Sequence, residues 1–101
     1  MPTRDELELL LEADPDDVFL IYAVAMACAS EGDAVEAISR LERLTDSHPD
    51  YVPAWFQRGQ LLAGLGQIDE ARHVLTRGTE VASQVGDDHA RQEMTEFLES
   101  L

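Results

Sequence analysis

Residues 15–49 read PDDVFLIYAVAMACASEGDAVEAISRLERLTDSHP, and this segment decides the fold because its landmarks return 34 positions later. Identical pairs at that offset include five landmarks: Pro15 and Pro49, Gly32 and Gly66, Glu36 and Glu70, Ala37 and Ala71, Leu41 and Leu75. A fixed period of roughly 20 to 50 residues is typical of proteins built from stacked units. The sequence therefore predicts two copies of one structural unit.

Each unit is predicted to form two helices separated by a glycine. In the first unit Asp14 is placed to cap a helix, with Pro15 at its first position. Gly32 ends this helix, and Asp33 with Glu36 has the spacing of an acidic capping box for the next one. Apolar residues at steps of three and four predict the inward faces: Val18, Ile21, Val24, Ala25 and Cys28, then Val35, Ile38, Leu41 and Leu44.

The second unit repeats this plan with small changes. Asp50 is placed to cap a helix from about Tyr51 to Leu65. A helix from about Ile68 follows, and it is expected to continue to Val85 because Ser83 stands where the first unit has its terminal proline. Its inward residues are predicted to be Ala71, Val74, Leu75, Gly78 and Val81.

Shorter segments at both ends continue the pattern. Thr3 and Glu6 have capping-box spacing, and the stripe of Leu7, Leu10 and Leu11 resembles the second half of a preceding unit. Near the other end, a helix starting at Asp87 or Asp88 is predicted to present one apolar face: Ala90, Met94, Phe97, Leu98 and Leu101. The prediction is an all-α domain over residues 1–101 with about six helices: a half-unit at 1–15, units at 18–51 and 52–85, and a closing helix at 87–101.

The charge of the chain is strongly negative. Twenty-one acidic residues face seven basic ones, all arginine, for a formal net charge of −14. Such a chain repels nucleic acid phosphates and anionic lipid surfaces, so neither is expected as a partner. Three explanations stay open: solubility in a source that grows at high salt, attraction of a basic partner, and the composition of a GC-rich genome. A cytoplasmic location is expected, because the start lacks the pattern of a signal peptide and no apolar run is long enough to span a bilayer.

The residues that could carry chemistry do not form a recognisable catalytic or metal-binding pattern. His48, His73 and His89 are scattered, and the candidates for a metal site, Asp87 and Asp88 with His89, are better explained as the capped start of a helix. Cys28 is the single cysteine and is expected to be a small buried residue. The sequence predicts no enzyme, no cofactor and no metal.

Both units resemble the tetratricopeptide repeat family, whose signature W-x2-L-G-x2-Y, A-x3-F and P spans about 34 residues. The matching positions are Trp55-x2-Arg58-Gly59-x2-Leu62 and Ala71-x3-Leu75 in the second unit, and Ile21-x2-Val24-Ala25-x2-Cys28, Ala37-x3-Leu41 and Pro49 in the first. Arg58 replaces the usual leucine. The resemblance implies a right-handed stack of antiparallel helix pairs with a concave groove lined by the first helix of each unit.

The resemblance also implies what the groove does: it receives an extended peptide or a helix of a partner protein. By position, its lining residues would be Phe19, Tyr22, Ala23, Met26, Ser30, Pro53, Phe56, Gln57, Gln60 and Gly64. The chain has neither lysine nor asparagine, so the clamp with which some members hold a C-terminal carboxylate is not expected. An apolar or helical ligand suits these aromatic and thioether side chains better. The alternative is a scaffold domain that uses the same patch to form a homodimer.

Overall fold

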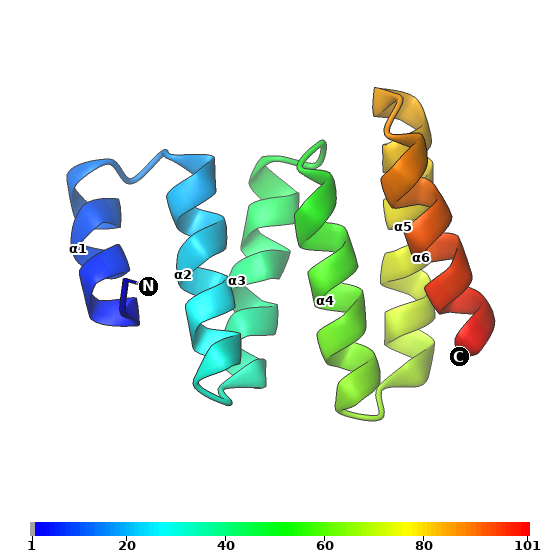
Figure 1. The fold of residues 1–101 in the computed structure, drawn as a ribbon, viewed down its shortest axis with the longest axis horizontal. Helices are drawn as coiled ribbons and strands as arrows, with labels where there is room; N and C mark the ends of the chain where they lie inside the picture. Colours follow the sequence, from blue (N-terminus) through cyan, green and yellow to red (C-terminus); the bar gives the residue numbers. More distant parts are fainter. Residues whose placement is uncertain (1) are drawn as a thin grey trace.

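The computed structural model describes residues 2–101, which form six α-helices and no strand (Figure 1). The helices are α1 (Arg4–Ala13), α2 (Val18–Ser30), α3 (Ala34–Ser47), α4 (Val52–Gly64), α5 (Ile68–Val85) and α6 (Asp88–Ser100). The predicted all-α class and the number of helices are confirmed for this part of the chain. The long α5, which continues to Val85, is also as predicted.

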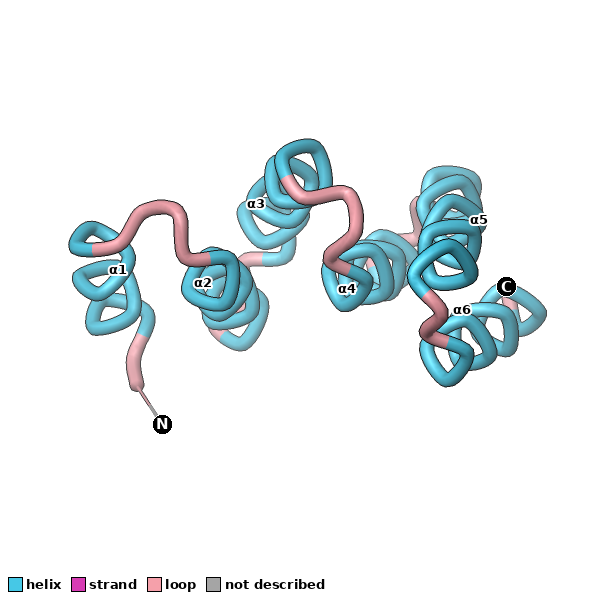
Figure 2. The backbone as a smooth tube through the Cα atoms, turned by 90° about the horizontal axis from the view of Figure 1, so that it is seen from above, coloured by secondary structure: helices cyan, strands magenta, loops and turns pink. Residues whose placement is uncertain are grey.

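The helices lie in two rows, with α1, α3 and α5 in one row and α2, α4 and α6 in the other (Figure 2). Each helix packs against its neighbours in sequence, so the chain passes from one row to the other at every turn. The first helices of the two predicted units, α2 and α4, therefore share a row with α6. This arrangement places α6 where the first helix of a third unit would stand.

Glycines end both of the first helices in the same way. Gly32 follows α2 with φ of 86°, and Gly66 follows α4 with φ of 78°. In both turns the amide after the glycine donates, at 3.0 Å, to the carbonyl of the third-last helical residue. A residue with a side chain rarely adopts this left-handed conformation, so the repeated glycine gives two equal turns.

The start of two helices differs from the prediction. Asp17, not Asp14, caps α2, because its Oδ1 accepts the Leu20 N–H at 3.1 Å. Asp17 directly precedes the apolar run, whereas Asp14 is the C-cap of α1, where its backbone N–H donates to the carbonyls of Leu10 and Leu11. Asp50 does not cap α4 either; Tyr51 stands at that position without a side-chain hydrogen bond. The caps predicted elsewhere are confirmed: Thr3, Asp33 and Asp87.

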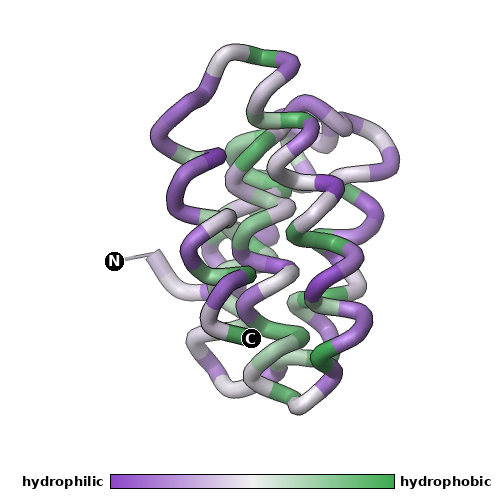
Figure 3. Tube along the Cα trace, turned by 90° about the vertical axis from the view of Figure 1, so that its right-hand side faces the viewer, coloured by the Kyte–Doolittle hydropathy of each residue, from purple (hydrophilic) through white to green (hydrophobic). Residues whose placement is uncertain are grey.

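The core is a band of small and branched side chains between the two rows, and hydrophobic residues gather toward the middle in an end view (Figure 3). The fully buried residues include Val24, Ala25, Cys28, Ala37, Leu41, Leu44, Ala71, Val74, Leu75 and Met94. Two residues predicted to face inward do not: Leu10 is 52% exposed and Val35 is 72% exposed. Leu10 lies on the side of α1 that has no neighbour, and Val35 is in the solvent-facing first turn of α3. None of the helices within residues 2–101 is both long and apolar enough to cross a membrane.

Candidate interaction groove

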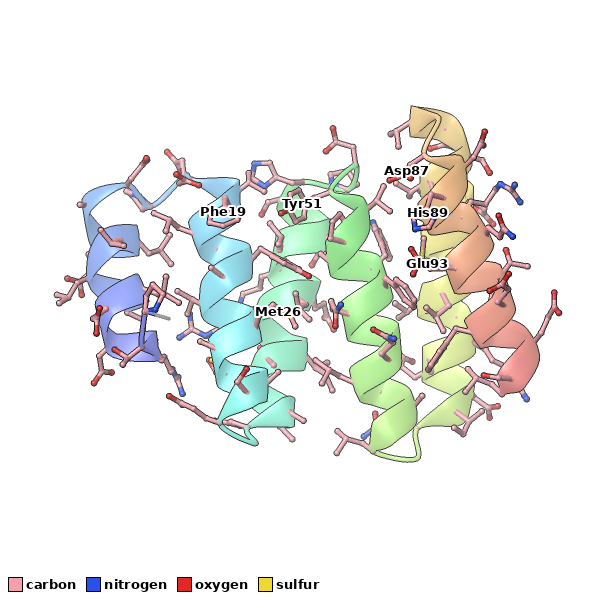
Figure 4. All side chains as sticks on the ribbon, viewed as in Figure 1. Phe19, Met26, Tyr51, Asp87, His89 and Glu93 are labelled. Carbon is pink, nitrogen blue, oxygen red and sulfur yellow. The ribbon has the colours of Figure 1, made fainter. Side chains whose placement is uncertain are left out.

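All ten residues predicted to line a groove lie on α2 and α4, in the row that faces the viewer in Figure 4. We call the outer side of α2, α4 and α6 the groove face. The most exposed of its large apolar residues is Phe19, with 67% of its surface accessible. Ser30, Pro53 and Gly64 are also exposed, and the other six are half-buried: Tyr22, Ala23, Met26, Phe56, Gln57 and Gln60.

An aromatic pair closes the gap between α2 and α4. The ring of Tyr22 packs edge-on against Tyr51, with 5.4 Å between the centroids. Burial raises the pKa of both hydroxyl groups, and the neighbouring Tyr51 raises the pKa of Tyr22 further, because two negative charges side by side repel. Both therefore stay neutral at physiological pH. Tyr51 is missing from the predicted groove, and since its counterpart in the first unit is Asp17, the repeat pattern held no signal for it.

A hollow of about 250 Å³ lies between α4 and α6. Its lining comprises Val52, Pro53, Phe56, Gln57, Asp87, His89, Ala90 and Glu93. Phe56 forms the floor and is itself supported by Phe97 of α6, with 6.1 Å between the ring centroids. Three of the predicted groove residues, Pro53, Phe56 and Gln57, thus come together in one concave place.

The polar side of this hollow comes from α6 and the residue before it. Asp87 caps the helix, its Oδ1 accepting the Ala90 N–H at 3.1 Å. His89 and Glu93 are one helical turn apart on α6, and His89 Nε2 lies 2.8 Å from Glu93 Oε1. Figure 4 shows Asp87, His89 and Glu93 on the side of α6 that faces α4. The sequence analysis missed these residues because it treated residues 87–101 only as a closing helix. Continuing the repeat by one more first helix would have pointed to Asp87, which lies 34 residues after Pro53, but not to His89 or Glu93, whose counterparts are Trp55 and Gly59.

These side chains do not form a metal centre. Among residues 2–101, no three or more His, Cys, Asp or Glu side chains lie together in a way that could hold a metal ion. The His89–Glu93 contact joins only two groups on an exposed helix turn. What the arrangement offers chemically is an apolar floor with hydrogen-bond acceptors at its rim.

Arg58, the residue that departs from the family signature, is turned away from the groove face. Its side chain is only 11% exposed and lies near Trp55, with 5.9 Å from the guanidinium carbon to the ring centre. It donates to Thr45 Oγ1 at 3.3 Å and to Glu42 Oε2 at 3.4 Å, both on α3. Since α2 carries no charged residue and Arg58 is the only one on α4, both helices present an uncharged surface to the groove.

A second hollow, of about 200 Å³, lies between the first three helices, away from the groove face. Its lining comprises Leu11, Ile21, Arg40, Arg43, Leu44, Ser47 and His48. Arg40 is held by Glu8 at 3.2 Å and by Glu36 at 2.9 Å. Arg43, the second arginine of this hollow, lies 4.0 Å from Glu36, so each arginine has an acidic neighbour within the molecule.

The paired helices, the repeated glycine turns and the exposed row of first helices define a helical repeat protein. A family model described as tetratricopeptide repeat matches residues 29–92. A TPR repeat-containing protein of Pseudomonas aeruginosa is 30% identical over 95 residues, which cover 94% of this chain and 90% of that protein. The chain belongs to the tetratricopeptide repeat family.

Solved structures of similar proteins have the same fold. A tetratricopeptide repeat domain protein from Salinibacter ruber superposes with a TM-score of 0.82 at 30% identity, covering 86% of this chain and 88% of that one. A protein of Bordetella parapertussis superposes with a TM-score of 0.86 at 26% identity, covering 99% and 87%. Domains of this family generally bind other proteins and generally have no catalytic activity.

Proposed function

We propose that this chain is a non-catalytic interaction module that binds a peptide or helix of a partner protein on its groove face. The observation that carries the proposal is the exposed ring of Phe19 beside half-buried Tyr22 and Met26, in line with the hollow between α4 and α6. Phe19 on α2 and the hollow between α4 and α6 lie along the same row of helices, and large aromatic side chains are enriched at the centre of protein interfaces. The predicted unit boundaries, 18–51 and 52–85, are part of this proposal.

A test should remove the apolar contact without unfolding the domain. Tyr22 and Phe56 are unsuitable because each packs against another aromatic ring. Phe19→Ser removes an exposed ring, and Val35→Ser is a matched control because Val35 is equally exposed but lies on α3, in the other row. Proteins captured from the native lysate by the wild type should be lost with Phe19→Ser and retained with Val35→Ser. Equal capture by all three proteins would refute binding on this face.

The alternative is a scaffold domain that pairs with a second copy of itself through the same patch. The sign of the charge argues against this pairing, since two copies would each bring a net charge of −14 to the contact. The mass in solution separates the two possibilities. A monomer that captures partners fits the proposed module, whereas a dimer that Phe19→Ser splits into monomers would favour the scaffold.

A further inference from the structure

The hollow between α4 and α6 combines an apolar wall with two carboxylates. Val52, Pro53 and Phe56 supply the wall, while Asp87 and Glu93 stand on the opposite side. Its volume of about 250 Å³ is below the roughly 300 to 1,000 Å³ of pockets that enclose drug-sized ligands. The hollow therefore fits one side chain of a larger ligand better than a whole small molecule.

Each carboxylate has acceptor capacity to spare. An ionised carboxylate has two oxygens and about four acceptor positions. Oδ1 of Asp87 is engaged by the Ala90 N–H, and Oε1 of Glu93 by His89. Within residues 2–101, the second oxygen of each group accepts no hydrogen bond. A ligand that brings several N–H donors would find acceptors on the rim of the hollow.

No arginine of the groove face compensates these two charges. The helix α2 has no charged residue, and Arg58 on α4 points to α3. On α6, Arg91 is paired with Asp88 at 3.9 Å. The net charge of −14 adds a long-range field of the same sign. The groove face is thus uncharged over α2 and α4, and acidic where α6 borders it.

We propose that the groove face binds a partner segment in which a lysine or arginine lies near apolar residues. The cation enters the hollow between α4 and α6, its aliphatic stem on Phe56 and Pro53 and its N–H groups on Asp87 and Glu93. Lysine and arginine suit such a place because their stems are apolar and their ends are charged donors. The apolar neighbours of the cation cover Phe19 and the adjoining part of α2.

This inference rests on the proposed groove binding, and the experiment must separate the two. The probe is a library of random dodecapeptides displayed on phage and selected on three proteins. These are the wild type, the double variant Asp87→Asn with Glu93→Gln, and the control Glu96→Gln with Glu99→Gln. The control removes two charges from exposed positions of the same helix, outside the hollow. Asparagine is as good a helix cap as aspartate, so the double variant keeps the start of α6.

The expected result is that peptides selected on the wild type and the control are enriched in lysine or arginine beside apolar residues. Selection on the double variant should yield apolar peptides without this enrichment. If peptides require Phe19 but show no basic residue, the groove proposal stands and the cation site is refuted. If no selected peptide depends on Phe19, both proposals fail together. Enrichment in acidic residues would also refute the cation site.

A double-mutant cycle with one selected peptide tests the contact itself. Replacing its basic residue by glutamine should weaken binding to the wild type roughly tenfold to a hundredfold, as expected for a charge-assisted hydrogen bond. The same replacement should change binding to the double variant by less than about twofold, because the partner charges are absent there. Equal losses on both proteins would show that the basic residue binds elsewhere and would overturn the assignment.

Discussion

The first and the last helix of the structure are held to the stack by different forces. Helix α6 inserts Met94, which is completely buried, into a cluster with Val52 and Leu75. Helix α1 has no buried residue; Leu7 and Leu11 are half-buried against α2, while Leu9 is 66% exposed. What α1 has instead is a set of ion pairs.

The ion pairs of α1 connect it to α3 and to the turn after α2. Arg4 pairs with Glu8 on its own helix and with Glu31 after α2, each at 3.3 Å. Glu8 pairs with Arg40 of α3 at 3.2 Å. The hydrogen bond with Glu31 raises the pKa of Arg4, which stays charged at every accessible pH. Burial of apolar surface is strong and insensitive to salt, whereas exposed ion pairs are weak and screened. We therefore expect α6 to unfold with the core and α1 to detach earlier.

The largest expected effect comes from the buried methionine. Met94→Ala should lower the free energy of unfolding by about 2 to 4 kcal/mol, because the lost side chain leaves a cavity between α4, α5 and α6. Leu11→Ala, its counterpart on α1, should cost roughly 1 kcal/mol, since that side chain is only half-buried. Urea denaturation followed by circular dichroism measures both. Equal losses would show that the two ends are held equally.

A close contact of three helices gives the next prediction. A Cβ atom on Gly78 would lie 2.7 Å from Met94 Sδ and 2.9 Å from Trp55 Cβ. Gly78→Ala should therefore lower stability by about 1 to 3 kcal/mol, although alanine is normally the better helix former. Gly64→Ala is the control, because nothing lies within 4 Å of the added atom there. The same denaturation experiment should show this control to be neutral or slightly stabilising.

The reactivity of the Cys28 thiol measures how readily α1 detaches from the stack. Cys28 is fully buried in a cluster that Leu7 and Leu11 of α1 cover, and burial raises the pKa of its thiol. Labelling with a thiol reagent should be about tenfold or more slower than in urea, because the thiolate is the reactive form and α1 must open first. The unfolded chain releases this proton more readily, so stability should fall as the pH rises above the ordinary thiol range near 8.5. Labelling as fast in the native protein as in urea would contradict this role of α1.

The smallest expected effect comes from the ion pairs. Glu8→Gln removes one of the two partners of Arg4 and one of the two partners of Arg40, and it should raise the labelling rate of Cys28 about twofold to fivefold at low salt. Molar salt should accelerate the wild type by a similar factor and the variant by less, because only the pair of Arg4 with Glu31 is left to screen there. Glu99→Gln, on α6, serves as the control and should leave the rate unchanged. A variant that labels at the wild-type rate would show that the two leucines alone hold α1.

Some residues of the candidate groove could be predicted from the sequence and others could not. Phe19, Phe56 and Pro53 were predicted because the family pattern places them on first helices, and the structure puts them on the groove face. That they bind a partner stays a prediction. Tyr51 and Glu93 could not be found in this way, since neither has a similar residue at the matching place in another unit. Their position depends on how α2, α4 and α6 turn toward one another.

The sequence by itself determined the helices, the glycine turns and most of the buried faces, because each of these is encoded within a few neighbouring residues. Spacing of apolar residues specifies which side of a helix turns inward, and Gly32 and Gly66 specify where the chain reverses. Only the tertiary structure decided that Asp87 and Glu93 would stand opposite Phe56, that Arg58 would point to α3, and that Val35 and Leu10 would face solvent. The reason is that contacts between helices depend on the packing of whole faces, and no local pattern records the partner that a face will meet.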